Sequence, residues 1–363
     1  MYLTFNLQNT GRQKLIIDRQ KIEDYVNKMM FYYDIPGLSV GVGHDGQLKY
    51  EKGFGYKNIE TKEKVDEQTV FHIASVAKLF VGTAIMQLME KGLLDITHTV
   101  KEYVPSFNVN DSRCEKITIK QMLSHTSGMP DVENYEWDRP QKDEEALERY
   151  VKSLKGINLL WEPGERFSYS NIAYDVLGHL IAKVSGLSFE EYIQRNIFEP
   201  LNMAHSSFLT YKRDMKEMAS PHIKDSDKHV GVSSVFPYNR IHGPSSTLTS
   251  DIKDIHIWAL ANLNKGSLEG SRILKESTYE LMWDPIMPIN EKERIGLSWF
   301  MRVYKARNLF GHEGSDTGFR SSFAIIPEDK VSVSVYANLQ SVPTRRIQQG
   351  IMDILFEDLK NKE

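Results

Sequence analysis

The spacing of hydrophobic residues near the start of the chain predicts a helix followed by a β-hairpin. Residues 16–34 carry apolar positions at helical spacing and stop before Ile35-Pro36-Gly37. Residues 38–43 (LSVGVG) and 47–56 (QLKYEKGFGY) then have the composition of strands. Asp45-Gly46 between them is typical of a tight hairpin turn.

A long apolar helix beginning near Ser75 is the next feature. From Val76 to Met89 apolar or small residues cover nearly every face, so we expect this helix to be buried and to end near Gly92. Lys78 is the only charged residue in that stretch. A buried ammonium without a partner is costly and tends to lose its proton. Because Ser75 precedes Lys78 by three residues, both side chains should lie on one helix face.

Helical patterns dominate the middle of the chain, and strand patterns return in the last quarter. Residues 118–128 and 172–186 are typical helices, each ending at glycine. Residues 296–303 and the paired segments within 319–339 are typical strands, and a closing helix follows from about Thr344.

This order of elements predicts an α+β fold with a mainly antiparallel sheet flanked by helices. We expect residues 1–100 and 236–363 to form the sheet domain, and residues 101–235 to form an inserted, mainly helical domain. The length of 363 residues allows a large core.

Composition and charge exclude several classes of function. A net charge of −4 gives no electrostatic case for nucleic acid or an anionic membrane. Cys114 is the only cysteine, so no intrachain disulfide or thiolate metal site can form, and the scattered histidines predict no metal or cofactor. The start lacks the pattern of a signal peptide, and no apolar stretch approaches a membrane span. We therefore expect a cytoplasmic protein.

Two motifs in the chain have a simple structural interpretation. Gly41–Gly46 (GVGHDG) matches a dinucleotide-binding pattern, but that pattern needs a helix next and a second strand follows here. Ser250 and Lys253 repeat the S-x-x-K spacing of Ser75 and Lys78. We interpret Ser250 as a helix N-cap followed by first-turn acids, and Lys253 as solvated.

Ser75 and Lys78 allow two interpretations on their own. Ser75 could cap the helix while Lys78 extends outward to solvent. Alternatively, a desolvated lysine with a lowered pKa takes the proton of the serine, which then acts as a nucleophile at the positive end of the helix.

Two further motifs in order along the chain favour the second interpretation. Ser75-Val76-Ala77-Lys78 is followed by Tyr169-Ser170-Asn171 and then by His312-Glu313-Gly314. In this order and spacing the chain resembles the serine β-lactamases and penicillin-binding proteins. The resemblance is closest to the class C branch and its esterase and D-aminopeptidase relatives.

The resemblance extends over nearly the whole chain. Residues 123–130 (LSHTSGMP), 161–186 and 197–208 are similar to family segments in family order. Each motif alone is weak, because Tyr56-Lys57-Asn58 and His44-Asp45-Gly46 also fit two of them. Those copies precede Ser75, which is the wrong order.

The resemblance implies a role for each matching residue. Ser75 would be the acylated nucleophile, and Lys78 its base or proton relay. Tyr169 would exchange a proton with Ser75 or the leaving group, as a unit coupled to Lys78. Asn171 would hold Lys78 and bind a substrate amide, although a helix N-cap is an alternative role. The backbone N–H groups of Ser75 and Ser315 would form the oxyanion hole.

The third motif departs from the family pattern at His312. Lysine is usual there and attracts a substrate carboxylate, whereas histidine is mostly neutral at pH 7. The change favours esters, amides or peptides without that carboxylate. Gly314 would be small so that substrate can lie along the strand. Glu313 should be solvated, and Arg320 should be solvated or at a sheet edge, unless it supplies the missing charge.

The leading functional hypothesis is a serine hydrolase that forms an acyl-enzyme on Ser75 and acts on a small-molecule or peptide substrate. A β-lactamase or DD-carboxypeptidase is the first alternative, although such substrates lie outside the cytoplasm. A non-catalytic member that binds a ligand or partner in the same cleft is the second. The oligomeric state stays open.

Overall fold

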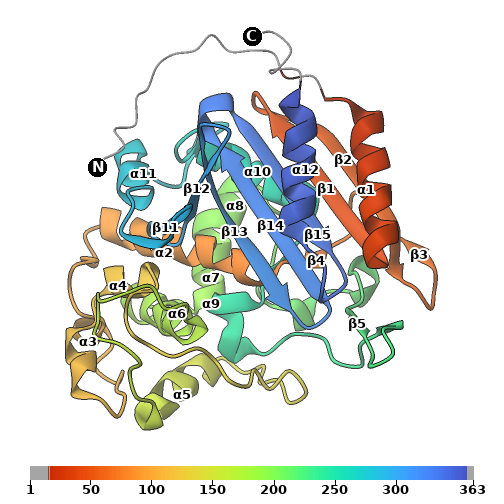
Figure 1. Ribbon diagram of the computed structural model, residues 1–363. Coiled ribbons are helices and arrows are strands. Elements are labelled where there is room, and N and C mark those ends of the chain that lie inside the picture. Colours follow the sequence, from red (N-terminus) through yellow and green to blue (C-terminus); the bar gives the residue numbers. More distant parts are fainter. Residues whose placement is uncertain (1–14, 16, 358–363) are drawn as a thin grey trace.

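One antiparallel sheet forms the centre of the computed structural model, which describes residue 15 and residues 17–357 (Figure 1). Within these residues the strand order is β10-β11-β12-β13-β14-β15-β1-β2-β3. The strands are β1 (Gly37–His44), β2 (Gln47–Asn58), β3 (Glu63–Lys64), β10 (Met287–Asn290), β11 (Glu293–Ile295), β12 (Phe300–Tyr304), β13 (Arg307–Asp316), β14 (Phe319–Ile326) and β15 (Val331–Ala337). The predicted α+β class with a mainly antiparallel sheet is confirmed.

The first hairpin explains the glycine-rich motif of the sequence. Asp45 and Gly46 both have positive φ, as a two-residue hairpin turn requires, so Gly41–Gly46 is a strand and turn as predicted. A Cβ on Gly41 would lie 2.6 Å from the side chain of Ile252, and one on Gly43 would lie 2.5 Å from that of His256. The glycines therefore let a helix approach this strand closely.

Helices cover both faces of the sheet (Figure 1). On one face, α1 (Arg19–Tyr33) and α12 (Thr344–Leu355) share an apolar cluster with β1 and β15. On the other face, α2 (Ala77–Glu90) and α10 (Ile252–Leu263) belong to a larger cluster. The sheet is thus the middle layer, with a hydrophobic core on each side.

The larger cluster continues into the helical part of the chain (Figure 1). The remaining α-helices of the described residues are α3 (Val100–Tyr103), α4 (Ile119–Leu123), α5 (Ala146–Ser153), α6 (Asn171–Ser185), α7 (Phe189–Ile193), α8 (Glu199–Leu201), α9 (Gly243–Ser246) and α11 (Glu276–Met282). The division into domains at residues 101 and 235 stays a prediction. Its outer ranges also include residues 1–14, 16 and 358–363, which lie outside the described residues.

Three short two-stranded ribbons contain the remaining strands of the described residues. They pair β4 (Phe71–His72) with β7 (Thr249–Ser250), β5 (His222–Lys224) with β6 (Val230–Val232), and β8 (Ser267–Leu268) with β9 (Ser271–Arg272). Ser250 therefore lies in a strand and is not the N-cap that we expected. Asp251 caps α10 instead, because its carboxylate accepts a hydrogen bond from the Asp254 N–H.

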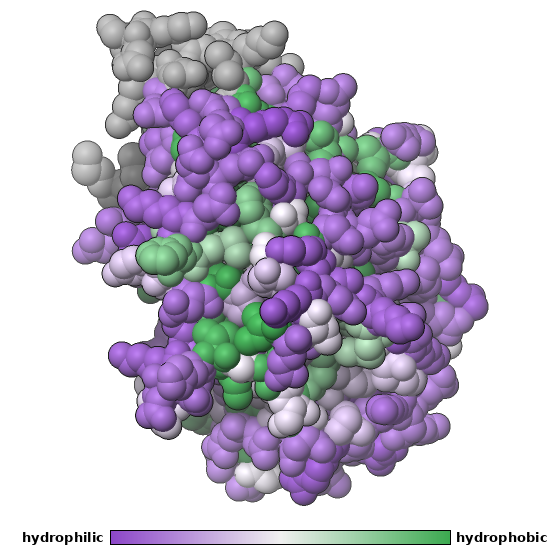
Figure 2. Space-filling model, turned by 90° about the vertical axis from the view of Figure 1, so that its right-hand side faces the viewer, coloured by the Kyte–Doolittle hydropathy of each residue, from purple (hydrophilic) through white to green (hydrophobic). Residues whose placement is uncertain are grey.

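None of the helices in residue 15 and residues 17–357 is long and apolar enough to span a bilayer. Figure 2 shows one face of the molecule, on which hydrophilic side chains cover most of the area and hydrophobic ones form scattered patches. The cytoplasmic location stays a prediction.

Candidate active site

Ser75 lies in a strained turn at the start of α2. The turn η1 (Ala74–Val76) precedes the helix, which begins at Ala77, so Ser75 is not the N-cap of α2. Ala74 has a φ of 48°, a conformation that costs a non-glycine residue on the order of 1 kcal/mol. Ile73 just before it donates its N–H to the Leu248 carbonyl. This backbone bond next to β4 and β7 thus helps to hold the turn that carries Ser75 in an unfavourable conformation.

The far end of α2 matches the expectation from sequence. Gly92 has a φ of 70°, its N–H bonds to the Met89 carbonyl, and the Leu93 N–H bonds to the Leu88 carbonyl. These bonds form a Schellman motif, which ends the helix.

Lys78 is fully buried and its amine contacts Ser75. Nζ lies 2.9 Å from the Ser75 Oγ. It also donates to Oδ1 of Asn171 at 2.6 Å and to the carbonyl oxygen of Ser245 at 2.5 Å. The predicted pairing of Ser75 and Lys78 on one face is therefore present, and the alternative of a lysine extending to solvent is wrong.

Burial lowers the pKa of Lys78 to about 7. Taking the ammonium out of water favours the neutral amine. The carboxylates of Asp175, Asp131 and Asp316 oppose this effect, with Asp175 contributing most among them. A substantial fraction of the amine is therefore neutral at physiological pH.

Tyr169 lies beside the same pair. Its half-buried ring stacks on His125 with centroids 4.2 Å apart, and the Lys78 Nζ lies 5.0 Å from its centroid. Burial raises the pKa of the Tyr169 phenol well above its ordinary value, although its hydrogen bond with Ser75 lowers it. The hydroxyl is therefore protonated at neutral pH and can donate a hydrogen bond.

Asn171 is the first residue of α6, and its side chain is oriented by Asp131. Oδ1 of Asp131 accepts from both the backbone N–H and the Nδ2 of Asn171, each at 2.8 Å. The remaining Oδ1 of Asn171 faces Lys78. The alternative N-cap role belongs to Ser170 instead, because its Oγ accepts from the Ala173 N–H.

The third motif lies on β13, where this strand has a free edge. The pairing of β12 with β13 ends at Gly311, so residues 312–316 pair with β14 on one side only, and the turn η1 packs against this part of β13. A Cβ on Gly314 would lie 2.3 Å from the Ile73 carbonyl oxygen and 2.9 Å from the Ala74 Cβ. The close approach of the turn that carries Ser75 therefore already requires glycine here, independently of any substrate.

His312 is buried and presents an unpartnered nitrogen. Nδ1 donates to the Glu313 carbonyl at 2.6 Å, whereas Nε2 has no partner among the described residues. The ring lies 4.9 Å from that of Phe300 and 6.3 Å from that of Tyr169. Burial and then the Lys78 charge lower the pKa of His312 to about 3. The imidazole is therefore neutral at pH 7, with Nε2 as a hydrogen-bond acceptor.

Two expectations around this motif are wrong. Glu313 is not solvated: its Oε1 lies 2.7 Å from the Arg302 Nη1, because a buried guanidinium needs a carboxylate partner. Arg320 is half-buried in β14, between β13 and β15, and is thus neither solvated nor at a sheet edge. Its Nε donates to the Gln340 carbonyl. Ser315, by contrast, is exposed on β13.

Several residues around Lys78 were missed from the sequence. The Ser245 carbonyl is a backbone atom and leaves no signal in the side-chain pattern. Asp131 and His125 lie in a loop, where any polar residue is ordinary. Asp175 is a charged residue within a buried helix, like Lys78. The criterion that identified Lys78 could therefore have identified Asp175.

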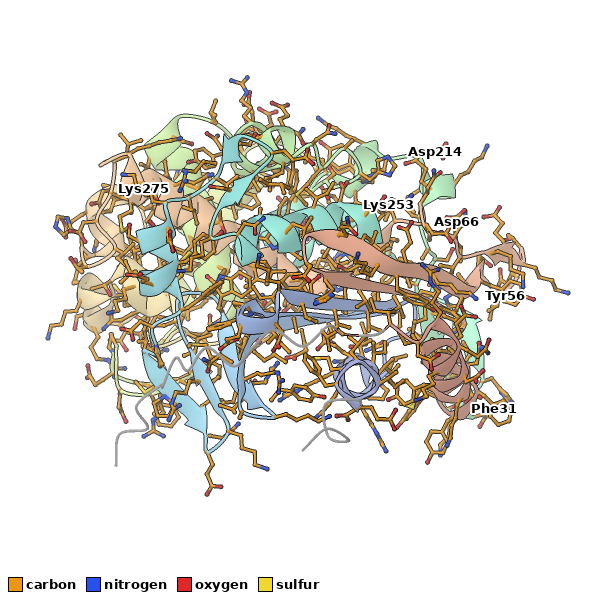
Figure 3. All side chains as sticks on the ribbon, turned by 90° about the horizontal axis from the view of Figure 1, so that it is seen from above. Phe31, Tyr56, Asp66, Asp214, Lys253 and Lys275 are labelled. Atoms are coloured by element: carbon orange, nitrogen blue, oxygen red, sulfur yellow. The ribbon has the colours of Figure 1, made fainter. Side chains whose placement is uncertain are left out.

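The competing copies of the motifs lie away from this site. Lys253 extends from α10 and pairs with Glu51 at 3.8 Å, as expected for a solvated lysine (Figure 3). Tyr56 lies near the end of β2, where Lys64 covers its ring (Figure 3). Among the described residues, no group of three or more His, Cys, Asp or Glu side chains could hold a metal ion.

The fold and the site together place the chain in the serine β-lactamase and penicillin-binding protein superfamily. The family model described as "Beta-lactamase" matches residues 22–353, and the chain belongs to this family. The resemblance seen in the sequence is thereby confirmed.

Two named proteins are similar to this chain in sequence. "Protein flp" of Staphylococcus aureus (strain N315) is 30% identical over 89% of this chain, which spans only 64% of that relative. The "Putative penicillin-binding protein PbpX" of Bacillus subtilis (strain 168) is 28% identical over 90% of this chain and 75% of its own length.

Two solved structures show the same fold. The octameric penicillin-binding protein homologue from Pyrococcus abyssi has a TM-score of 0.82 at 27% identity, over 94% of this chain and 78% of that one. A D-stereospecific amidohydrolase from Streptomyces sp. has a TM-score of 0.77 at 19% identity, over 93% and 98%.

Proposed function

We propose that the chain is a serine hydrolase that forms an acyl-enzyme on Ser75 and acts on an ester, amide or peptide. The observation that carries this proposal is the set of contacts at Lys78. One buried amine with a pKa near 7 touches the Ser75 hydroxyl, the Asn171 amide and the Ser245 carbonyl. A structural lysine would gain nothing from contact with a serine hydroxyl in a strained turn.

Lys78 is the general base in this proposal. A neutral amine has two N–H donors and one lone pair. The Asn171 Oδ1 and the Ser245 carbonyl can only accept, so they take the two N–H groups. The lone pair then points at the third contact, the Ser75 Oγ, and accepts its proton.

The proton then moves through Tyr169 to the leaving group. Ser75 Oγ attacks the substrate carbonyl carbon as its proton passes to Lys78 Nζ. The Tyr169 phenol, which its raised pKa keeps protonated, donates to the leaving oxygen or nitrogen and is reprotonated by Lys78. The bond to the leaving group breaks, and water later hydrolyses the ester on Ser75 by the reverse path.

Backbone groups would stabilise the tetrahedral intermediate. The N–H groups of Ser75 and Ser315 are the proposed oxyanion hole, because η1 packs against β13 and the edge of β13 is free beyond Gly311. Asn171 would bind a substrate amide as well as Lys78.

Charge near the site favours substrates without a carboxylate at the position of His312. This imidazole is neutral at pH 7, and the carboxylates of Asp131 and Asp316 already act on the Lys78 amine. A substrate carboxylate would therefore find no fixed positive charge at the position of His312. The class C-like character and esterase activity are part of this proposal.

A penicillin-reactive enzyme is the second candidate function. It is favoured by the curated relative that is named as a putative penicillin-binding protein. The same acyl-enzyme on Ser75 would form, with opening of a β-lactam ring or release of a terminal D-residue.

Ester hydrolysis and covalent labelling of Ser75 test the proposal. Purified protein should hydrolyse a short-chain p-nitrophenyl ester and gain the mass of a fluorophosphonate probe on Ser75. Ser75→Ala should lose both, whereas Ser250→Ala, the serine of the second S-x-x-K spacing, should retain both. Penicillin acylation without ester hydrolysis would select the second candidate. Failure of all three reactions would indicate a non-catalytic binding protein.

A further inference from the structure

The two oxygen atoms that hold Lys78 come from different elements. Asn171 is at the start of α6, and Ser245 lies in the one-turn helix α9. The lone pair of Lys78 points at Ser75 only while both acceptors keep their positions. Something must therefore fix α6 and α9 relative to each other.

A buried contact between Asp175 and His242 joins these two elements. Asp175 lies four residues after Asn171 on α6, and His242 is the residue immediately before α9. Oδ2 of Asp175 lies 2.8 Å from Nδ1 of His242, and their side chains are 0% and 2% exposed. The contact therefore sits directly behind the Asn171 and Ser245 atoms that face Lys78.

The helices approach each other closely at the same place. Pro244 of α9 packs on Gly178 of α6, where a Cβ would lie 2.0 Å from the proline ring. Rings of Tyr135, Trp137 and Tyr150 surround His242 with centroids 4.9 to 5.8 Å away. This packing keeps water from replacing the contact between the carboxylate and the imidazole.

We propose that Asp175 and His242 are positioning residues: their buried contact fixes the Asn171 and Ser245 oxygens, so that the lone pair of neutral Lys78 points at Ser75 Oγ. This inference rests on the proposed function and names what orients its base. Asp175 also acts on the amine by charge, since its carboxylate is the strongest of those that raise the pKa of Lys78.

Other titratable groups surround the amine and are unchanged in the test variants. They lie on the loops, helices and strand packed against Lys78: His125, Asp131, Tyr169, Tyr174, His312 and Asp316. Tyr135 and Tyr150 face Asp175 and His242 from the side away from Lys78, and burial raises the pKa of both phenols.

The charge part is tested by titrating Lys78 directly in the full chain. In NMR spectra of protein with isotope-labelled lysine, the Cε signal of Lys78 is the one that disappears in Lys78→Arg. This signal should titrate with a midpoint near pH 7 in the wild type. In Asp175→Asn the midpoint should fall by about one pH unit. Asp251→Asn removes another buried carboxylate, which contacts the exposed His205 at 2.8 Å, and should leave the midpoint unchanged. An unchanged midpoint in Asp175→Asn would overturn the inference.

The positioning part is tested at a pH where Lys78 is neutral in every variant. At about pH 9, Asp175→Asn should keep most of the fluorophosphonate labelling rate, because the amide oxygen can still accept from His242. Asp175→Leu should lose at least about tenfold, with circular dichroism showing that it folds. Wild-type labelling in Asp175→Leu would refute positioning. If the fluorophosphonate does not label the wild-type chain, the proposed function is refuted. The titration of Lys78 still tests the effect of the Asp175 charge in that case.

Discussion

A lysine with a pKa of about 7 and a histidine with a pKa of about 3 lie in one site, and burial is the main cause of both lowered pKa values. Lys78 and His312 are 0% and 2% exposed, and the Lys78 charge adds to burial in lowering the pKa of His312. Removing water disfavours the charged form of both bases. The site thereby holds two nitrogens that can be neutral at physiological pH: the Lys78 Nζ faces Ser75, and the His312 Nε2 has no partner among the described residues.

Replacing Lys78 should change the pH dependence of stability as well as abolish acylation. The pKa of the amine falls from 10.5 unfolded to about 7 folded, so the unfolded chain binds more protons between these values. Wild-type stability should therefore be lost as pH falls through this window, by about 1.4 kcal/mol per pH unit. Relative to Lys78→Met, urea unfolding at several pH values should show this slope.

The test is the slope of this free-energy difference against pH and not its absolute size. The absolute size also includes the cost of leaving the Asn171 and Ser245 oxygens without their donor in Lys78→Met. A free-energy difference between wild type and Lys78→Met that is flat from pH 7 to 10.5 would show that the buried amine titrates normally.

Restoring the lysine of the family pattern should shift substrate preference. His312→Lys places a cation where the wild type has a neutral imidazole. The ratio of penicillin acylation to neutral ester hydrolysis should rise by about tenfold, the effect of one partly screened charge pair. Matched esters with and without a carboxylate give the same comparison. An equal ratio in both proteins would mean that this position does not select charge.

The proposed reacting residues could be identified from the sequence because their chemistry conflicts with their surroundings. Lys78 was recognised as the one charge in an apolar helix, and His312 as a departure from lysine. Asp131 could not be found in this way, since a carboxylate in a polar loop is unremarkable until its contact with Asn171 is known.

Among the elements, the turn η1 and the strand β13 form one unit. The strand stops pairing with β12 at Gly311, and beyond that point η1 packs on β13 and β14. Neither element alone defines the site, because the oxyanion donors that we propose come from both. Their separation is controlled by the missing side chain at Gly314.

Adding one methyl group at this contact should disrupt the site. In Gly314→Ala the new Cβ meets the Ile73 carbonyl oxygen at 2.3 Å, so η1 must move away from β13. Ester hydrolysis should fall by about 100-fold and stability by about 1–3 kcal/mol. Gly156→Ala is the control, because a Cβ there meets nothing within 4 Å. Retained activity in Gly314→Ala would show that the two elements can separate without loss.

The starts of α4, α6 and α12 were predicted to within one residue, whereas α1 and α2 begin three and two residues after the predicted starts. The errors in choosing a capping residue have a common cause. Ser170 and Asn171 are both good capping residues, as are Ser250 and Asp251, and the pattern cannot choose between neighbours. Tertiary contacts decide: Asn171 is held by Asp131, and Ser250 bonds to Ser206.

For the molecule as a whole, buried neutral histidines link stability to acid. His256 is 8% exposed and neither ring nitrogen has a partner among the described residues. Burial lowers its pKa from 6.5 to about 4. The unfolded chain therefore takes up a proton first as the pH falls, and stability is lost across this window.

Removing this group should reduce the acid sensitivity of the whole chain. Between pH 6.5 and about pH 4, wild type should lose about 3 kcal/mol more than His256→Leu, which has no imidazole to protonate. The measurement is chemical unfolding at both pH values. His229→Leu is the control, because this side chain is 81% exposed. Equal losses in wild type and His256→Leu would contradict the assignment.

Local hairpins could be predicted from the sequence, but the pairing of the first strand with the last could not. The β1–β2 hairpin and the hairpin within residues 319–339 each show strand patterns on both sides of turn residues. The pairing of β1 with β15 has no such local signal, because the two strands are separated by most of the chain. Resemblance to the family supplied what periodicity could not.

The pairing of β1 with β15 also has a consequence for synthesis on the ribosome. Residues 37–44 emerge long before residues 331–337, and at ordinary translation rates the delay is on the order of tens of seconds. Throughout that time β1 has one open edge and an apolar face without α12, a state that pairs readily with other nascent chains. Yield in a heterologous host should therefore depend on chaperone supply more than on the stability of the finished protein.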